Sequence, residues 1–488
     1  MPLVSTQYGP VLGTDADVLS FKGIPYAAPP VGPNRFQPPR PPEPWTSPRD
    51  VRGYGATPPQ TRSEGLMAEL IPRTIIPGDD YLNLNVWTPG LTGRAPVMVF
   101  IHGGSFTSGS GALSVYDGTR FARDGVVLVT INYRLGADGF LWFGDGTPNL
   151  GLLDQIAALT WVRDNIDGFG GDPGNVTIFG ESAGAMSVCT LLAMPAAEGL
   201  FHRAIAQSGA GHNTIGPSSA RQVGARLAAV LGTAPTREAI ARVPVPQLLA
   251  AQDNLSQQVA AKPRAKLWGD VARTLLPFSP VVDGDFLPGA PLDRIRSGAA
   301  ADVDLLIGTN SEEARLFLVP TGVGARMNTP FLYAAAALRF GLPVGGVRRY
   351  RAGRPGATAG DVLAAVMTDS YYRIPAIRLA EAHQGTYVYE FGWRSPACDG
   401  TLGACHGLEL AFVFDNLDDP SAAAMLGSAP PQHLADLVHK SWVDFAVSGD
   451  PGWPPYTRQQ RISRHFNTAS GTTTNDRPAE RLTWHNRR

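Results

Sequence analysis

Cysteine is scarce in this chain: only three occur among 488 residues, Cys189, Cys398 and Cys405. An odd and small number of cysteines excludes a disulfide framework as the main support of the fold. We expect reduced thiols, although Cys398 and Cys405 lie close enough in sequence to close a loop as a disulfide. With 43% apolar residues, the chain is long enough to bury a large core instead.

An excess of charge of one sign is also missing, since 41 Lys and Arg stand against 42 Asp and Glu, for a net charge of −1. No basic block appears, so nucleic acid is not expected as a partner. No run approaches the roughly 18 apolar residues of a membrane span, so we expect no membrane partner. The N-terminus has no basic stretch followed by an apolar one, and a cytoplasmic location is therefore expected unless a leader was removed.

Metal and cofactor motifs are absent as well. The chain contains no His-Glu-x-x-His and no Cys-x-x-Cys, and the glycine-rich stretch 108–111 lacks the lysine that ends a phosphate loop. We expect no metal and no organic cofactor. What is abundant is glycine (55) and proline (43), a composition typical of a loop-rich globular enzyme.

The pattern of apolar runs predicts an α/β fold with a large, mostly parallel central sheet flanked by helices. Continuous apolar runs are typical of buried parallel strands, and one alternating run, 82–88, also predicts a strand. Between the runs lie helical stretches such as 152–166, and such alternation favours a sheet covered on both faces. We expect one domain over 1–488, with helical insertions at about 215–300 and 320–380. The continuous runs are 96–102, 126–132, 176–179, 204–208 and 305–309.

One Gly-x-Ser-x-Gly motif, Gly180-Glu-Ser182-Ala-Gly184, lies between the apolar run 176–179 and a stretch of small residues typical of a helix. A strand that turns sharply into a helix is the context of a nucleophile elbow, with Ser182 at its tip. The alternative is a glycine-bounded turn whose serine caps a helix. In the first case the chain is an esterase of the α/β-hydrolase kind.

The segment His102-Gly-Gly-Ser-Phe106 follows the run 96–101 directly. Consecutive glycines let backbone N–H groups approach a bound oxygen, and such donors stabilise the oxyanion of a tetrahedral intermediate. Ala183, which follows the nucleophile, supplies a further N–H. The alternative is a flexible glycine turn without a catalytic role.

A carboxylate and a histidine would complete a set of catalytic residues with Ser182. Glu312 and Glu313 follow the run 305–309, where a carboxylate can orient a histidine, and spacing alone does not choose between them. Among nine histidines, His406 alone lies in a flexible glycine-bounded loop, whereas His102 belongs to the oxyanion segment. The order Ser, Glu, His is that of α/β-hydrolases. The alternatives are a solvated acidic pair at a helix start and a structural histidine.

Taken together, these pieces resemble type-B carboxylesterases, the family of para-nitrobenzyl esterases and cholinesterases, over nearly the whole chain. The resemblance implies the α/β-hydrolase fold, a catalytic triad of Ser182, Glu313 and His406, and oxyanion donors at Gly104, Ser105 and Ala183. It also implies a supporting Arg134–Asp154 ion pair, with Ser208 near the acid. The matching segments are 21–27, 35–36, 84–87, 132–136, 151–155 and 169–173.

Some positions depart from the family pattern. Pro58 and Tyr81 stand where many members have a disulfide, which fits a reducing compartment. Ser105 replaces a glycine but keeps its N–H, and Ala314 replaces a glycine after the acid. Residues 58–80 contain no aromatic side chain and Leu316 occupies another aromatic position, so choline specificity is not expected.

We therefore predict a serine carboxylesterase with broad specificity for small-molecule esters, acting as a monomer or weak homo-oligomer. Phe106 and Phe317 are predicted to line an apolar substrate pocket. Two alternatives stay open: an amide, carbamate or thioester hydrolase or acyltransferase on the same triad, or a non-catalytic cholinesterase-like binding protein.

Overall fold

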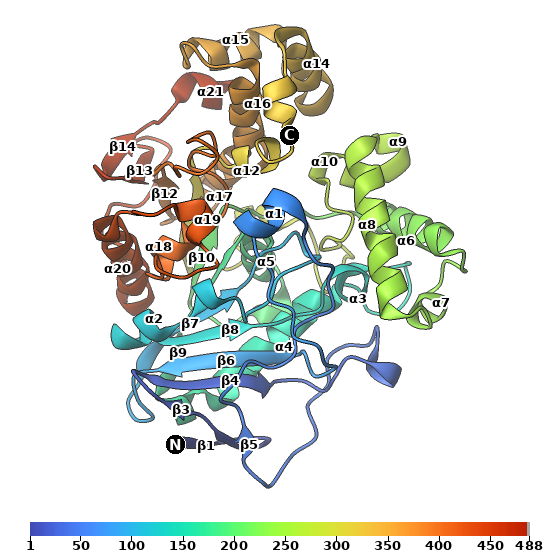
Figure 1. Cartoon of the computed structure of the whole chain (residues 1–488), viewed down its shortest axis with the longest axis vertical. Helices are drawn as coiled ribbons and strands as arrows, with labels where there is room; N and C mark the ends of the chain where they lie inside the picture. The colour runs from blue at the N-terminus through green and yellow to red at the C-terminus, as the bar shows by residue number, and fades with distance from the viewer. Residues whose placement is uncertain (486–488) are drawn as a thin grey trace. The chain divides into compact units, whose positions relative to one another are not determined.

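The computed structural model describes residues 1–485 (Figure 1). The chain divides into two compact units. The first unit comprises residues 1–63, 73–205 and 211–303. The second comprises residues 64–72, 206–210 and 304 onward. Strand β10 (Arg203–Gln207) begins in the first unit and ends in the second.

The first unit is built on a sheet in which strand β7 (Ala95–Ile101) lies between two parallel neighbours. It runs parallel to both β8 (Val127–Ile131) and β9 (Gly171–Glu181). The side chains from Val97 to Ile101 are fully buried, because a parallel strand between two others is covered on both faces. The predicted strands at 96–102, 126–132 and 176–179 are thereby confirmed, and β9 begins five residues earlier than its apolar run.

The strands beyond β8 are antiparallel. They continue the sheet in the order β6 (Asn83–Thr88), β4 (Leu19–Pro25) and β3 (Thr14–Asp15), which confirms the strand expected at 82–88. A separate small sheet joins β1 (Leu3–Thr6), β2 (Gly9–Leu12) and β5 (Arg49–Asp50).

Helices of the first unit lie between or after its strands in the sequence, and several of them occupy the insertion predicted at about 215–300. Helix α4 (Leu150–Asn165) confirms the helix expected at 152–166, and α5 (Ala183–Leu191) starts one residue after the motif serine. The others are α2 (Thr119–Arg123), α3 (Gly136–Phe140), α6 (Pro217–Leu231), α7 (Arg237–Ala241), α8 (Val245–Ala261), α9 (Ala265–Trp268), α10 (Val271–Thr274) and α11 (Pro291–Arg296).

The second unit has its own strands and helices. Strand β11 (Asp304–Asn310), expected at 305–309, runs parallel to β12 (Tyr387–Phe391), which runs parallel to β13 (Ile462–Phe466), and β14 (Gly471–Thr474) is antiparallel at the edge. Its helices are α1 (Gly65–Leu70), α12 (Arg315–Leu318), α13 (Val323–Arg326), α14 (Thr329–Phe340), α15 (Val344–Ala352), α16 (Ala359–Thr368), α17 (Ile374–Ala382), α18 (Leu410–Val413), α19 (Ala423–Leu426), α20 (Gln432–Ser448) and α21 (Pro478–Thr483).

Hydrogen bonds join the two ends of the segment from Thr57 to Ile76. Thr57 N–H donates to the Ile76 carbonyl at 2.9 Å, and Ile76 N–H donates back to the Thr57 hydroxyl at 3.0 Å. The Gln60 side chain exchanges a pair of hydrogen bonds with the backbone of Gly109. All three cysteines are free thiols, as expected.

Candidate active site

Ser182 is the single residue between β9 and α5, so it sits on a very tight strand-to-helix turn. Its φ of 56° and ψ of −121° lie outside the regions that side-chain-bearing residues prefer. The glycines on either side permit this turn, because a Cβ on Gly180 or Gly184 would overlap the carbonyl of Ile101. Such strain at an otherwise ordered residue is typical of functional positions, and the geometry is that of a nucleophile elbow.

The glycine segment after β7 lies against this serine. A Cβ placed on Gly103 would fall 3.1 Å from the Cβ of Ser182, so only glycine allows this close approach. Gly104 has a φ of 110°, and Ser105 and Phe106 also have positive φ. Within residues 1–485 the backbone N–H groups of Gly104, Ser105 and Ala183 have no hydrogen-bond acceptor. Three unpaired donors beside a strained serine are what an oxyanion hole requires.

His102 anchors the glycine segment. Its ring stacks on Tyr133 with centroids 4.5 Å apart, and its Nδ1–H donates to the Gly103 carbonyl at 2.8 Å. The Tyr133 hydroxyl donates to the His102 carbonyl at 2.8 Å. Burial lowers the pKa of His102 to about 4, so the ring is neutral near pH 7. This histidine is therefore a structural support, in agreement with its exclusion as the base.

In the second unit, the structure brings Glu313 and His406 together. Glu313 lies three residues after β11, and its Oε2 accepts a hydrogen bond of 2.6 Å from Nδ1 of His406. Its Oε1 accepts from the N–H of Asn310 at 2.7 Å, and the Glu313 carbonyl accepts from the N–H of His406 at 3.2 Å. Both side chains are buried. A fully held carboxylate fixes the orientation of the imidazole and stabilises its charged form.

Glu312, the neighbour that spacing could not exclude, has a different role. Its Oε1 accepts from Arg315 at 2.8 Å, and its Oε2 bonds the Arg394 guanidinium. Burial alone would raise the pKa of Glu312, but the two arginines and the N–H of Ala404 outweigh burial and lower it. Glu312 thus stabilises the loop that carries His406, whereas Glu313 orients the imidazole ring of His406.

A second buried carboxyl, Glu409, lies behind this pair and was not found from the sequence. Asn310 Nδ2 donates to Glu409 Oε2 and to the Cys405 carbonyl, both at 2.6 Å. Gln207 donates to Glu409 Oε1 at 3.2 Å. Burial, followed by the charge of Glu313, raises the pKa of Glu409. The only sequence signal was its place three residues after His406.

The two predicted pocket phenylalanines have different surroundings. Phe317 is 38% exposed, and its ring lies 5.4 Å from that of His406. Tyr372, which the sequence did not single out, lies closer to the same imidazole, at 4.9 Å. Phe106 is fully buried and packs on Phe140 at 4.8 Å. The pocket role of both phenylalanines stays a prediction.

The supporting ion pair implied by the resemblance is present. Arg134 Nε and Nη2 donate to the two carboxylate oxygens of Asp154 at 2.8 and 2.6 Å, and the Arg134 N–H adds a third bond. Both side chains are almost completely buried. Ser208 has a φ of 54°, and within the described chain its buried hydroxyl has no partner. Its predicted support of the acid is therefore not visible as a hydrogen bond.

Ala314 fits its position without strain. It has a φ of −69° and a ψ of −10°, so the glycine usual in the family is not needed for its backbone. Its N–H donates to the Thr368 hydroxyl at 3.2 Å, which ties the residue after the acid to α16.

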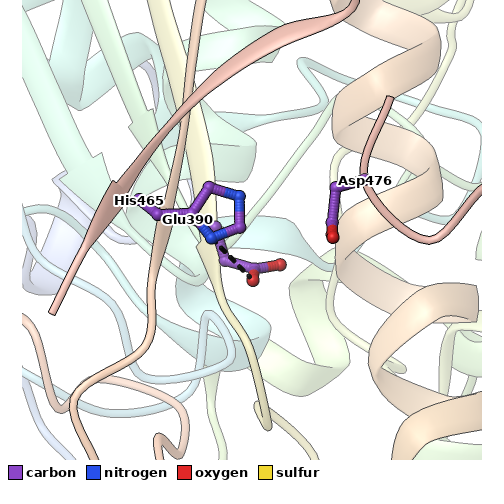
Figure 2. Close-up of side chains that lie close together, drawn as sticks. All are labelled: Glu390, His465 and Asp476. Carbon is purple, nitrogen blue, oxygen red and sulfur yellow. Dashed lines mark ion pairs between the residues drawn. The ribbon is translucent and has the colours of Figure 1, made fainter. Parts of the chain in front are cut away.

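Among residues 1–485, one cluster of a histidine and two carboxylates has its possible metal ligands close together. Ligand atoms of Glu390, His465 and Asp476 lie within 4.8 Å of one another (Figure 2). However, the guanidinium of Arg477 contacts Glu390 and donates to Asp476 at 2.6 Å. Burial, followed by the charge of Arg373, lowers the pKa of Arg477 to about 9. Because a cationic side chain already bonds both carboxylates, the cluster is an ion-pair network.

Comparisons with known proteins agree on one family. The model of the carboxylesterase family matches residues 1–328 and 349–482. Para-nitrobenzyl esterase of Bacillus subtilis is 40% identical over 478 residues, which cover 94% of this chain and 93% of the relative. A medium-chain fatty acyl-CoA hydrolase precursor of Anas platyrhynchos is 33% identical over 94% of this chain and 88% of its own. The crystal structure of a carboxylesterase from Geobacillus stearothermophilus matches with a TM-score of 0.87 and 36% identity, over 99% of this chain and 100% of the other.

Proposed function

The chain belongs to the carboxylesterase family and is a carboxylic ester hydrolase with the α/β-hydrolase fold, and we propose that it cleaves small-molecule esters with the triad Ser182, His406 and Glu313. The observation that carries this assignment of residues is the 2.6 Å hydrogen bond between Glu313 and His406. It supports the triad because a buried, carboxylate-held imidazole is the base that a serine nucleophile needs.

In the proposed reaction, the Ser182 hydroxyl attacks the ester carbonyl while His406 takes its proton. Glu313 holds the imidazole in the tautomer with a proton on Nδ1, so that Nε2 is the basic nitrogen. His406 then returns the proton to the leaving alcohol, and an acyl group remains on Ser182. Water repeats the two proton transfers and releases the acid. No step needs a metal or an organic cofactor.

The negative oxygen of each tetrahedral intermediate would rest on the N–H groups of Gly104, Ser105 and Ala183. These groups are already held in place by the anchored glycine segment and the first turn of α5. Such preorganised donors typically contribute about 2.7–4 kcal/mol each to transition-state stabilisation. Because they are backbone groups, their contribution does not depend on the side chain at 105.

A panel of p-nitrophenyl esters of increasing acyl length tests the activity and its breadth. Ser182→Ala is expected to reduce kcat by about a millionfold, because triad members act as one unit. His406→Ala should abolish both turnover and covalent labelling of Ser182 by an organophosphate, detected by mass spectrometry of the intact protein. Undiminished labelling in folded His406→Ala would remove His406 from the proposed triad.

Acyl thioesters are a second candidate substrate class, because one relative is named a fatty acyl-CoA hydrolase. The same triad can attack a thioester carbonyl, and the oxyanion donors would serve equally. Comparing kcat/KM for an acyl-CoA and a p-nitrophenyl ester with the same acyl chain separates the two. Matched amide and carbamate substrates, and alcohol acceptors, extend the comparison to the remaining reactions.

A further inference from the structure

Positive charge accumulates without compensation in one part of the second unit. Residues 314–360 contain seven arginines and no aspartate, glutamate or lysine, although the whole chain is nearly neutral. The arginines are Arg315, Arg326, Arg339, Arg348, Arg349, Arg351 and Arg354. Arg315 pairs with Glu312 and Asp361, and Arg354 pairs with Glu480, so these carboxylates all come from outside the segment.

Four of the remaining arginines are available to an anionic partner. Arg326 donates only to backbone carbonyls, and Arg349 and Arg351 donate only to threonine hydroxyls. Neither these three nor Arg348 has a carboxylate partner within the described chain. Arg326, Arg348 and Arg349 are exposed to solvent. The surface therefore carries a net positive charge that the protein itself does not neutralise.

Helix α14 presents an apolar face to solvent in the same segment. Phe331, Ala334, Ala335 and Leu338 have the spacing i, i+3, i+4 and i+7, so they form one stripe on the helix. Phe331 is 65% exposed and Leu338 is 88% exposed, which is unusual for large apolar side chains. The other face of the helix is already used, since Leu332 and Ala336 are fully buried in a core cluster. The stripe is thus free to contact a partner.

The stripe borders a shallow hollow of about 290 Å³. Val323, Arg326 and Met327 line its other side, so apolar and cationic groups meet in one depression. Val344, the first residue of α15, adds a further large apolar side chain that is 49% exposed. Figure 1 shows α14 and α15 side by side, and the two helices are bent by 118° to one another.

Part of this segment is not matched by the family model. The family model stops at residue 328 and resumes at 349, so all of α14 and the start of α15 lie outside the matched residues. In residues 1–485, no single helix is long and apolar enough to cross a membrane, and α14 and α15 pass that test only together. Two helices joined at a sharp bend, one with an exposed apolar stripe and the other with exposed arginines, suit a position in a membrane interface rather than across it.

We propose that the surface of α13 to α15, from Val323 to Arg351, docks on an anionic lipid surface. The exposed apolar side chains of α14 would enter the boundary between head groups and acyl chains, and the arginines would bind lipid phosphates and carboxylates. A second copy of this chain is the less suitable occupant, because a twofold contact would bring the same uncompensated arginines face to face. This inference goes beyond the proposed esterase reaction and replaces the expectation that no membrane is involved.

Sedimentation with phosphatidylcholine vesicles, with and without phosphatidylserine, tests the proposal. The full-length protein should bind the anionic vesicles at least about tenfold more strongly than the neutral ones. Phe331→Ser/Leu338→Ser should reduce binding to anionic vesicles about tenfold or more, and Arg348→Gln/Arg349→Gln should reduce it by a similar factor. High salt should weaken binding without abolishing it, because the apolar contacts are not screened.

Matched controls use surface residues outside this segment. Val447→Ser removes a half-exposed apolar side chain from α20, and Arg62→Gln/Arg242→Gln removes two exposed arginines. Both controls should bind vesicles like the wild type. All variants should hydrolyse soluble p-nitrophenyl acetate equally, which verifies folding and keeps this test independent of the esterase proposal.

Three results would overturn the proposal. The first is equal binding to neutral and anionic vesicles, and the second is binding that Phe331→Ser/Leu338→Ser leaves unchanged. The third is a concentration-dependent dimer that the same variant abolishes, because a second copy would then be the occupant. Sedimentation velocity in the absence of lipid measures this last outcome.

Discussion

Glu313 Oε2 accepts a 2.6 Å hydrogen bond from His406 Nδ1, whereas the adjacent Glu312 bonds arginines instead. We therefore expect Glu313→Gln to lower kcat by about 10³–10⁴-fold. The amide would favour the wrong imidazole tautomer and would not stabilise the charged ring. Steady-state kinetics with p-nitrophenyl acetate, on protein whose fold is checked by circular dichroism, measure the loss.

The matched control is Glu312→Gln, one residue away. It removes ion pairs that are partly exposed, and such pairs usually contribute only about 0–1 kcal/mol to stability. The ring of His406 would keep its carboxylate, so kcat should stay within roughly tenfold of the wild type. A greater loss in Glu312→Gln than in Glu313→Gln would reverse the assignment of the acid.

The proposed oxyanion donors give a prediction that distinguishes the effect of a backbone N–H on kcat from the effect of a side chain. Gly104→Ala should lower kcat about 10²–10³-fold, the usual effect of losing one donor. The added Cβ would overlap the Ser108 carbonyl, and the φ of 110° is strained for alanine. Ser105→Ala keeps the backbone N–H and should change kcat little. If Ser105→Ala were the more damaging change, the hydroxyl rather than the N–H would be the functional group.

Sequence patterns located most of the proposed site because its parts follow buried strands. The elbow at Ser182 and the glycine segment at 103–104 each need glycine where the chain is crowded, and that need is visible as a motif. The choice between Glu312 and Glu313 was not accessible from spacing, because it depends on which carboxylate faces His406 in three dimensions.

Other features were hidden for a similar reason. Asn310, Glu409 and Tyr372 meet His406 or its acid through contacts between distant segments, and none belongs to a local motif of its own. The arginines of 314–360 are spread out and form no basic block, and the absence of acidic residues between them is not a local motif. That the two units form one domain stays a prediction, which a single cooperative unfolding transition would support.

The buried pair of Arg134 and Asp154 predicts a large effect on stability. Arg134→Met leaves the Asp154 carboxylate buried without a partner and should reduce the free energy of unfolding by about 3–5 kcal/mol. Arg134→Met/Asp154→Leu should lose less than the single variant, because no isolated charge remains. Urea denaturation followed by tryptophan fluorescence gives both values.

An exposed ion pair supplies the comparison for Arg134. Lys440 pairs with Asp444 on the surface of α20, and Lys440→Met should change the free energy of unfolding by about 0.5 kcal/mol or less. Equal losses in the buried and exposed variants would mean that burial of the Arg134–Asp154 pair has no energetic consequence.

Glu409 predicts a dependence of stability on pH. Burial and the charge of Glu313 raise the pKa of Glu409 in the folded protein, so its proton is held to a higher pH than in the unfolded chain. Its contribution to stability is complete below the unfolded pKa of about 4.3 and is lost as pH rises through the folded pKa. Glu409→Gln cannot ionise, so its Tm relative to the wild type should improve as pH rises above the unfolded pKa of about 4.3.

Differential scanning calorimetry at several pH values measures this change. The glutamine amide has one oxygen where the carboxylate accepts hydrogen bonds on two, so the test lies in the slope of the Tm difference with pH rather than in its absolute value. Glu69→Gln, on the exposed surface, is the control and should give a flat difference. If the Tm difference between Glu409→Gln and the wild type were also independent of pH, the Glu409 carboxyl would have the same pKa in the folded and unfolded states.

The hydrogen bonds between Thr57 and Ile76, in a protein whose three cysteines are free thiols, have a practical consequence. Nothing in this loop can be opened by a thiol, so dithiothreitol should leave the enzyme's melting curve and turnover as they were. An esterase that tolerates strong reductants can be stored, purified and assayed under conditions that would reduce the disulfides of a cross-linked protein.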